Sequence, residues 1–182
     1  MTDAVEALRR GEPVVLPTDT VYGLCCEATA RESTDRLYAL KRRDLSQPAA
    51  LLAANVDDLV AAVPELDREQ LLTGPYTLIL PNPARRFPWI TGTTPEKIGV
   101  RVPDLPAAAA DVVRELGVVV ATSANLHGAG DPVSLDDLAP ELRRLVVVDA
   151  GDLLGTPSTV IDFTGEEPRV LRQGAGAFSP AS

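Results

Sequence analysis

Residues 14–24 (VVLPTDTVYGL) form the stretch from which the fold is best read. The stretch begins with a β-branched run, which is typical of a buried strand, and Pro17 then ends the pairing because it has no amide donor. We predict a strand over residues 14–16 and a loop that carries Thr18, Asp19, Thr20 and Tyr22. In open α/β sheets, ligands bind outside the carboxyl ends of strands. The loop is therefore either the lining of a pocket or a polar turn whose hydroxyls cap the backbone.

Size and composition favour one folded domain, residues 1–182. With 182 residues the chain can bury a sizeable core, and its 45% hydrophobic content excludes disorder. The apolar runs are too short to cross a bilayer, and the N-terminus carries acidic residues where a secretory signal needs basic ones. The adjacent Cys25 and Cys26 cannot link distant segments. We therefore expect a cytoplasmic protein without membrane contact.

The charge is acidic, with a net value of -9. This value argues against a surface that grips nucleic acid broadly, but it allows a local basic pocket. Of the 17 basic residues, only Lys41 and Lys97 are lysines. A lysine kept where arginine dominates is a weak indication of chemistry, and drift is the alternative explanation.

The rest of the chain alternates helical and strand patterns. We predict helices over residues 4–10, 33–43, 56–63, 65–72 and 105–116, and strands over residues 49–53, 76–80, 98–102, 118–121 and 145–148. Residues 157–162 and 169–172 are predicted to pair as a hairpin, which makes part of the sheet antiparallel. The residues after 174 show no periodicity and are expected to be loose. The prediction is an α/β domain with a mixed sheet.

Local signals add detail to this prediction. Ser33 or Thr34 is expected to cap the second helix, Asn55 the third, and Ser134 is expected to form a capping box with Asp137. Residues 81–95 hold four prolines and form a long irregular loop, which is more often functional than idle.

Several polar groups stand where a pocket would need them. Lys41 and Arg43 end a predicted helix, where they either serve chemistry or simply complement the helix dipole. Arg101 lies inside a strand, and a buried arginine there needs an acidic partner or an anionic ligand. Ser123 and Asn125 follow the most apolar strand. Guanidinium and ammonium groups suit phosphate and carboxylate, so the residues alone predict a pocket for an anionic small molecule, a nucleotide or an amino acid.

Other chemistries lack their motifs. Neither a phosphate-binding P-loop nor a dinucleotide-binding glycine fingerprint is present. The sole histidine, His127, follows Ser123 closely, but no nucleophile elbow surrounds the serine, so a hydrolase is the weaker interpretation. Cys25 and Cys26 have no second cysteine pair for zinc, and as nucleophiles they would need His127 as a base. We expect no protein-bound metal.

Motifs in a fixed order make the sequence resemble a known family. The chain resembles the YrdC-like family, specifically the short bacterial threonylcarbamoyl-AMP synthases (TsaC type), over about residues 11–174. The motifs that carry the resemblance are residues 17–24 (PTDTVYGL), 40–43 (LKRR), 53–55 (AAN), 74–77 (GPYT), 89–92 (WITG), 100–102 (VRV), 122–126 (TSANL) and 171–174 (LRQG). Each motif is weak alone, and their joint order is specific.

The resemblance implies both a fold and a reaction. The fold is a twisted mixed α/β sheet with flanking helices around a deep cleft. In the reaction, L-threonine, bicarbonate and ATP give threonylcarbamoyl-adenylate and pyrophosphate, with Mg²⁺ carried on ATP and no prosthetic group. The product is handed to a tRNA threonylcarbamoyl transferase complex, and a weak contact with tRNA is a further expectation.

The resemblance also assigns roles to residues. The implied catalytic residues are Lys41, Arg43, Ser123 and Asn125. The implied ATP-binding set comprises these four with Gln47, Lys97 and Arg172. The implied threonine-binding residues are Thr20, Tyr22, Arg101, Ala121 and Ser158.

Three alternatives remain at this point. The first alternative is the synthase. The second is a protein of the same fold without synthase activity, either a YciO-type paralogue or an RNA- or nucleotide-binding protein. Carbamoyl-adenylate chemistry on another acceptor is the third alternative, and the absence of partner domains argues against it. The intact pairs at Lys41 and Arg43 and at Ser123 and Asn125 favour the synthase.

Overall fold

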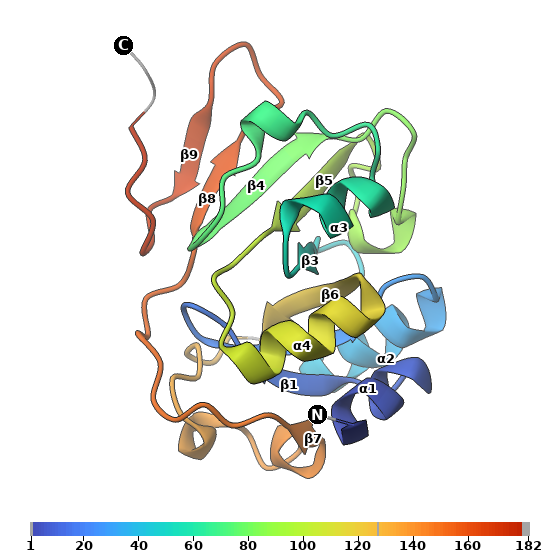
Figure 1. Ribbon diagram of the computed structural model, residues 1–182, viewed down its shortest axis with the longest axis vertical. Helices are drawn as coiled ribbons and strands as arrows, with labels where there is room; N and C mark the ends of the chain where they lie inside the picture. Colours follow the sequence, from blue (N-terminus) through green and yellow to red (C-terminus); the bar gives the residue numbers. More distant parts are fainter. Residues whose placement is uncertain (1, 127, 180–182) are drawn as a thin grey trace.

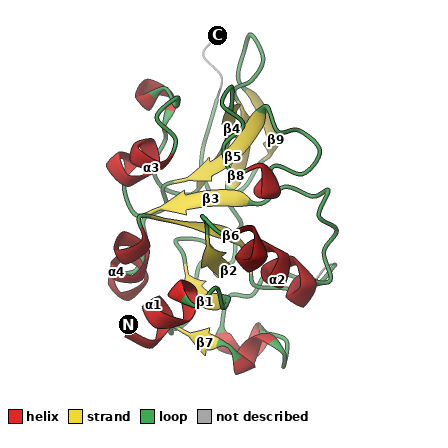
Figure 2. Ribbon diagram, turned by 90° about the vertical axis from the view of Figure 1, so that its right-hand side faces the viewer, coloured by secondary structure: helices red, strands yellow, loops and turns green. Residues whose placement is uncertain are grey.

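The computed structural model describes residues 2–126 and 128–179, and within them the strands form one nine-stranded sheet. Its order is β7-β1-β2-β6-β3-β5-β4-β8-β9, and Figure 2 shows the strands following one another from β9 and β4 at the top to β7 at the bottom. The strands are β1 Val14–Pro17, β2 Tyr22–Glu27, β3 Ala50–Ala53, β4 Tyr76–Pro81, β5 Lys97–Arg101, β6 Val118–Ser123, β7 Val146–Val147, β8 Thr159–Asp162 and β9 Arg169–Arg172.

Helices cover the sheet on both faces. The α-helices are α1 Thr2–Arg9, α2 Arg31–Lys41, α3 Val56–Ala62 and α4 Ala107–Leu116. Short 3-10 turns occur at Arg68–Gln70, Pro88–Ile90, Leu135–Asp137 and Leu142–Arg144. Helices α1 and α4 lie side by side and share one hydrophobic cluster, whereas α2 and α3 contribute to the other (Figure 1). None of the helices in the described part of the chain is long and apolar enough to cross a membrane.

The sheet mixes parallel and antiparallel pairs. Strand β3 is parallel to β5, β4 to β8 and β1 to β7, while the remaining neighbours are antiparallel. Because β1 and β6 are each antiparallel to β2, they run in the same direction. Their carboxyl ends, Pro17 and Ser123, therefore lie at the same edge of the sheet. The predicted α/β fold with a mixed sheet is confirmed.

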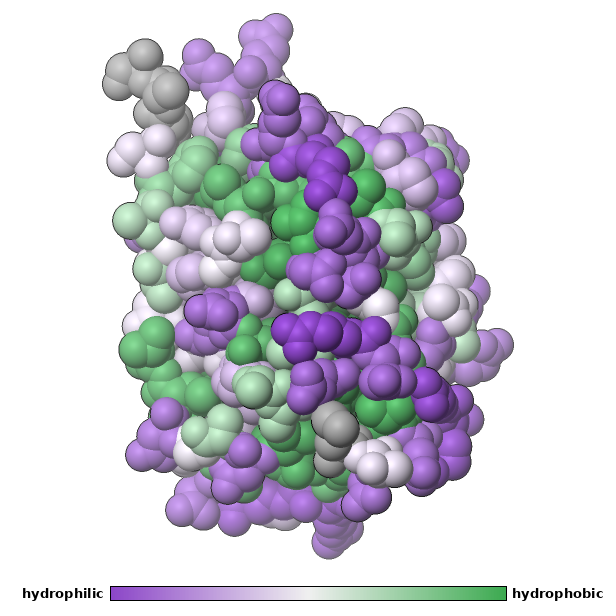
Figure 3. Space-filling view, viewed as in Figure 1, coloured by the Kyte–Doolittle hydropathy of each residue, from purple (hydrophilic) through white to green (hydrophobic). Residues whose placement is uncertain are grey.

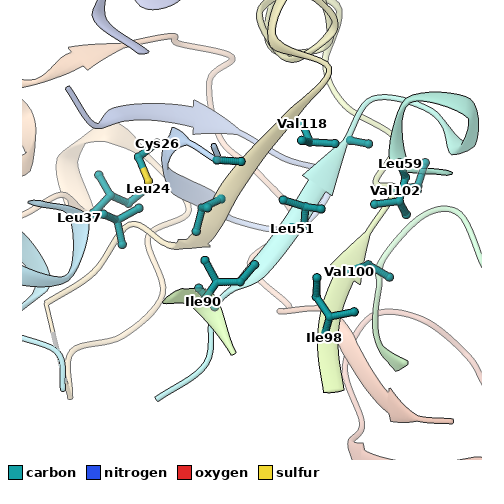
Figure 4. Close-up of a cluster of buried hydrophobic side chains, with 14 of the residues drawn as sticks. Leu24, Cys26, Leu37, Leu51, Leu59, Ile90, Ile98, Val100, Val102 and Val118 are labelled. Carbon is teal, nitrogen blue, oxygen red and sulfur yellow. The ribbon is translucent and has the colours of Figure 1, made fainter. Parts of the chain in front are cut away.

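Two-residue periodicity divides the β4, β5 and β8 region into a core face and a polar face. Ile98 and Val100 of β5 lie in the larger hydrophobic cluster, with Leu78 of β4 and Ile161 of β8. Figure 4 shows the β5 pair among Leu51, Leu59 and Val118. Successive side chains of a strand point to opposite faces. The residues between these apolar ones therefore face away from this core.

The space-filling view shows one face of the whole molecule, from the side on which α3 and α4 lie in Figure 1. Hydrophilic side chains cover much of the face seen in Figure 3, and hydrophobic groups show between them. Three large hydrophobic side chains are exposed among the described residues: Leu45, Leu154 and Leu171.

The prediction of a loop after Pro17 is wrong from Tyr22 onward. Tyr22–Glu27 is strand β2, which pairs with β1, so the true connection is only Thr18–Val21. Sequence patterns missed β2 because Gly23 and the two cysteines give no alternation. In the structure, both faces of β2 are covered, and Leu24, Cys25 and Cys26 are all buried.

Two helical predictions also need correction. Ser33 and Thr34 are buried inside α2, which starts at Arg31, and the Glu27 carboxylate accepts from the amides just before that helix. The helix predicted over 65–72 is only the turn Arg68–Gln70. Leu66 is the one buried residue of that segment, so the segment lacks the apolar stripe that would stabilise a helix. The Asn55 cap and the Ser134–Asp137 capping box are confirmed.

The tail predicted to be loose is packed as far as the structure describes it. The carbonyl of Gly176 accepts from Thr159 Oγ1, and the Tyr76 hydroxyl donates to the carbonyl of Ala177. Phe178 packs edge-on against Phe163. These contacts hold residues 176–178 in place without forming a helix or strand, so no sequence periodicity marks them. Residues 180–182 lie outside the described residues.

Candidate active site

A cavity of about 500 Å³ lies where the ends of β1 and β6 meet the polar face of β4, β5 and β8. Its walls combine hydroxyl, guanidinium and small apolar side chains. The lining residues include Thr18, Thr20, Arg43, Thr77, Lys97, Gly99, Arg101, Ala121, Thr122, Ser123, Asp131, Ser158, Asp162 and Arg172. The topology therefore brings most of the predicted site residues to one place.

Lys41 supports the cavity from behind. The side chain is buried, and its ammonium donates to the carbonyls of Ser123 at 2.5 Å and Asn125 at 2.8 Å and to Asn125 Oδ1 at 2.7 Å. Three acceptors match the three donors of an ammonium group. Burial and the neighbouring Arg43 lower the pKa of Lys41 to about 8. Lys41 thus fixes the backbone turn that follows β6.

Ser123 and Asn125 form a connected pair above Lys41. The Ser123 hydroxyl donates to Asn125 Oδ1 at 2.8 Å, and the Asn125 amide donates to the carbonyl of Ala129 and to Asp131. Ser123 and Asp131 line the cavity, whereas Asn125 is not among its lining residues in the described part of the chain. Because its oxygen serves Lys41 and Ser123, the Asn125 carboxamide has one orientation.

Arg43 brings a partly satisfied guanidinium to the cavity. It donates to Thr122 Oγ1 at 2.8 Å and to the carbonyl of Pro48 at 2.5 Å, and it lies 5.5 Å from the centre of the Tyr38 ring. Burial lowers the pKa of Arg43. Its Nε is buried without a hydrogen-bond partner in the described structure. A buried, unpaired donor is costly, so an anion at this wall would be stabilising.

Arg101 forms the second cationic wall. It donates through Nη2 to Asp19 at 2.9 Å and to Thr20 Oγ1 at 3.4 Å. Burial lowers the pKa of Arg101, and the Asp19 carboxylate opposes that shift. Among the described residues, its Nε is the second buried side-chain nitrogen that lacks a partner. Both unpaired nitrogens thus belong to arginines of the cavity.

Arg172 and Ser158 extend this wall from β9 and the start of β8. Arg172 donates through Nε and Nη2 to the carbonyl of Ser158, and Nη2 also reaches the serine hydroxyl at 3.2 Å. That hydroxyl lies 2.8 Å from Thr77 Oγ1. Lys97, further along the polar face, makes a long ion pair of 3.5 Å with Asp162. The Lys97 ammonium therefore remains largely available to a ligand.

Two predicted residues lie elsewhere. The Tyr22 hydroxyl lies 3.0 Å from Asp149 Oδ1 and 2.8 Å from the carbonyl oxygen of Gly151, the two acceptors of its single proton, and it lies outside the described cavity wall. Gln47 is half-buried, and its backbone carbonyl accepts from Tyr38, again outside that wall. Their roles as threonine and ATP contacts stay predictions. His127 lies outside the described residues.

Sequence reasoning assigned no role to several lining residues. Thr77 and Thr122 belong to motifs that carry the family resemblance but received no role, and Asp131 and Asp162 belong to none of those motifs. Asp19 also received no role, and it lies next to the lining residues Thr18 and Thr20. The alternation of apolar residues in β4 and β5 does indicate which of their side chains face away from the core. If Ile98 and Val100 are core, then Lys97, Gly99 and Arg101 must share the other face.

The two cysteines are free and buried. Within residues 2–126 and 128–179, no group of three or more His, Cys, Asp or Glu side chains is placed to hold a metal ion. Burial raises the pKa of Cys25 to about 12 and that of Cys26 further. Both thiols are therefore protonated near neutral pH and fill space in the core.

Comparison with known proteins identifies the family. The family model Sua5_yciO_yrdC, described as "Telomere recombination", matches residues 6–174. This chain belongs to the Sua5/YciO/YrdC family. The family thereby accounts for the ordered motifs around Pro17, Lys41, Arg101 and Ser123.

Curated Sua5/YciO/YrdC relatives carry consistent names. A protein of Chromohalobacter salexigens named threonylcarbamoyl-AMP synthase is 34% identical over 92% of this chain and 94% of its own length. One of Bacillus subtilis with the same name is 34% identical over 96% of this chain, but this chain spans only 53% of it.

Solved structures share the fold. P. abyssi Sua5 complexed with L-threonine is 29% identical with a TM-score of 0.78, over 94% of this chain and 53% of that one. E. coli YciO is 26% identical with a TM-score of 0.82, over 96% of this chain and 88% of that one. This chain thus spans about half of the Sua5 protein and most of YciO.

Proposed function

We propose that this chain is a threonylcarbamoyl-AMP synthase, which converts L-threonine, bicarbonate and ATP into threonylcarbamoyl-adenylate and pyrophosphate. The observation that carries the proposal is one cavity lined by two partly satisfied arginines, Arg43 and Arg101, among hydroxyl side chains. The names of the curated relatives and the threonine complex of P. abyssi Sua5 support it.

The amino acid binds at the Arg101 wall. A guanidinium with free donors suits a carboxylate, ideally with two hydrogen bonds. Thr20, buried beside Arg101, and Ser158, held by Arg172, supply hydroxyls for the polar groups of threonine. Ala121 lines the cavity with a small side chain and leaves room for the ligand.

The triphosphate binds at the Arg43 wall. Arg43 and Ser123 face the phosphates, Lys41 places its charge behind the Ser123–Asn125 turn, and Lys97 and Arg172 add cations on the polar face. Magnesium enters with ATP as part of the substrate.

The reaction then needs alignment and charge neutralisation. The threonine amine attacks carbon dioxide and loses a proton, or it attacks bicarbonate, whose C–O bond breaks as water leaves, and either route gives a carbamate. A carbamate oxygen attacks the α-phosphorus of ATP, and the bond from that phosphorus to the β-phosphate oxygen breaks as pyrophosphate leaves. Holding the reactants in one cavity removes much of the entropic cost, and the cations stabilise the developing negative charge.

The product would serve a later step. Threonylcarbamoyl-adenylate is a mixed anhydride, so we expect a tRNA threonylcarbamoyl transferase complex to consume it in the cytoplasm. The net charge of -9 limits any direct tRNA contact to a local one.

Pyrophosphate release tests the proposal. Purified protein is mixed with ATP, L-threonine and bicarbonate, and each component is left out in turn. We expect pyrophosphate only in the complete mixture. ATP binding without threonine-dependent release would instead support the non-synthase alternative, a YciO-type or nucleotide-binding role.

A further inference from the structure

Asp19 contacts Arg101, which lines the cavity, while Asp19 itself is not among the lining residues of the described structure. The two side chains are almost fully buried, with 12% of the Arg101 side chain and 10% of the Asp19 side chain exposed. A buried guanidinium is expensive unless it is paired. Asp19 supplies that pairing from the β1–β2 turn, at 2.9 Å from Arg101 Nη2.

The pairing leaves part of Arg101 unused. The carboxylate contacts one guanidinium nitrogen, although an Arg–carboxylate pair can form two parallel bonds. Within the described residues, Arg101 Nε is buried and makes no hydrogen bond. Asp19 therefore balances the charge of Arg101 without occupying its full set of donors.

The position of Asp19 is itself held from both sides. The backbone amide of Asp104, just beyond β5, donates to the other oxygen of Asp19 at 3.3 Å. Within the turn, Thr18 Oγ1 donates to the carbonyl of Val21 and accepts from the amides of Thr20 and Val21. These hydrogen bonds hold the turn in one conformation, which sets the direction from which Asp19 contacts Arg101.

We propose that Asp19 is a positioning residue, which sets the orientation of Arg101 so that its free donors meet the carboxylate of the amino-acid substrate. The inference rests on the proposed function and extends it from Arg101 to the acidic residue behind it. Asp19 touches the guanidinium and acts on the substrate only through it.

Charge and orientation predict opposite effects for Asp19→Asn. Removing the negative charge makes the wall more positive, which by Coulomb attraction alone would tighten the binding of a carboxylate. Losing the fixed orientation would weaken binding, because a hydrogen bond to a charged group contributes a factor of roughly ten or more. The positioning role therefore predicts that L-threonine binds about tenfold more weakly to D19N.

Calorimetric binding of L-threonine to the full chain measures this effect directly. L-Threoninol, which has no carboxylate, is the comparison ligand, and we expect D19N to lose most of the preference for threonine over threoninol. Steady-state kinetics should show a raised KM for threonine with the KM for ATP unchanged. Asp111→Asn is the matched control, because Asp111 forms an exposed ion pair with Arg114.

Asp19→Glu covers the case in which D19N does not fold. Glutamate keeps the charge but moves the carboxylate by one methylene, so we again expect weaker threonine binding. D19N or D19E protein that binds threonine as tightly as the wild type, or more tightly, overturns the inference alone. Wild-type protein that does not bind threonine overturns the proposed function as well.

Discussion

At the scale of the single residue, the site depends on two buried cations, Lys41 and Arg101. An arginine inside β5 was expected to need an acidic partner or an anionic ligand, and Arg101 has Asp19 as its partner and an unpaired Nε as well. The sequence could not show which acid pairs with it, because Asp19 is distant in the chain. The sequence also could not show in which direction the Lys41 side chain points. Its contacts with Ser123 and Asn125 depend on where α2 packs.

Arg43→Ala tests the proposed role of the Arg43 wall. We expect the variant to fold, because Arg43 is a half-buried wall residue whose bonds go to Thr122 and Pro48. Its rate of pyrophosphate release should fall by about 100-fold or more, since one preorganised electrostatic partner of the transition state is lost. Arg42→Ala is the matched control, because Arg42 forms an exposed pair with Glu141. Equal rates for Arg43→Ala and the wild type would remove Arg43 from the site.

The lowered pKa of Lys41 predicts opposite pH effects on activity and stability. Above about pH 8 the side chain loses a proton and one of its three donors, so kcat/KM for ATP should decline. Between about 8 and its ordinary value of 10.5, the unfolded chain holds more protons at this residue than the folded one. The contribution of Lys41 to stability therefore rises with pH over this window.

A pH–rate profile of the wild type checks the predicted decline in kcat/KM. Lys41→Arg keeps a charge that does not titrate in this range, so any activity it retains should lack the decline. A wild-type profile that stays flat well above pH 8 would contradict the assignment. Thermal unfolding of both proteins over the same pH range checks the effect on stability.

At the scale of helices and strands, the sequence pattern predicted the elements that have a clear hydrophobic periodicity. Strands β3, β4, β5 and β6 and the β8–β9 hairpin follow the expected ranges within a residue or two. Strand β2 was missed because it is buried on both sides and has no alternation. The tail was misjudged because its order comes from contacts with Tyr76, Thr159 and Phe163, which only the folded structure brings close.

Gly176→Ala tests whether the tail is packed as described. A Cβ at this position would overlap the ring of Tyr76. Overpacking of this kind costs about 1–3 kcal/mol, so the urea midpoint should fall. Gly165→Ala is the control, because its Cβ would meet only an ordinary contact in the β8–β9 turn. An unchanged midpoint for Gly176→Ala would show that residues 174–179 do not pack on β4.

At the scale of the whole molecule, one sheet brings distant motifs together. The shared direction of β1 and β6 places the turn with Asp19 and the turn with Ser123 at one edge, and the polar face of β5 and β8 completes the cavity. These motifs are separate in the sequence, and the family resemblance predicts that they form one site. Composition alone could not predict that the motifs meet, because the strand order depends on long-range pairing.

The two cysteines give a test of the core as a whole. Cys25 and Cys26 are buried, and burial raises the pKa of both thiols, to about 12 for Cys25. Since the thiolate is the reactive form, the native protein should resist alkylation by iodoacetamide at neutral pH and react only after unfolding. Rapid alkylation of the folded chain would contradict the burial of β2.

The most direct measurement of the central claim is the mass of the product. Purified protein is incubated with ATP, L-threonine and isotope-labelled bicarbonate, and the mixture is analysed by mass spectrometry. We predict an adenylate that contains both threonine and the labelled carbon, formed by the wild type and lost in Arg43→Ala. An adenylate without the label, or the absence of any threonine-containing adenylate in an active, ATP-binding preparation, would contradict the account.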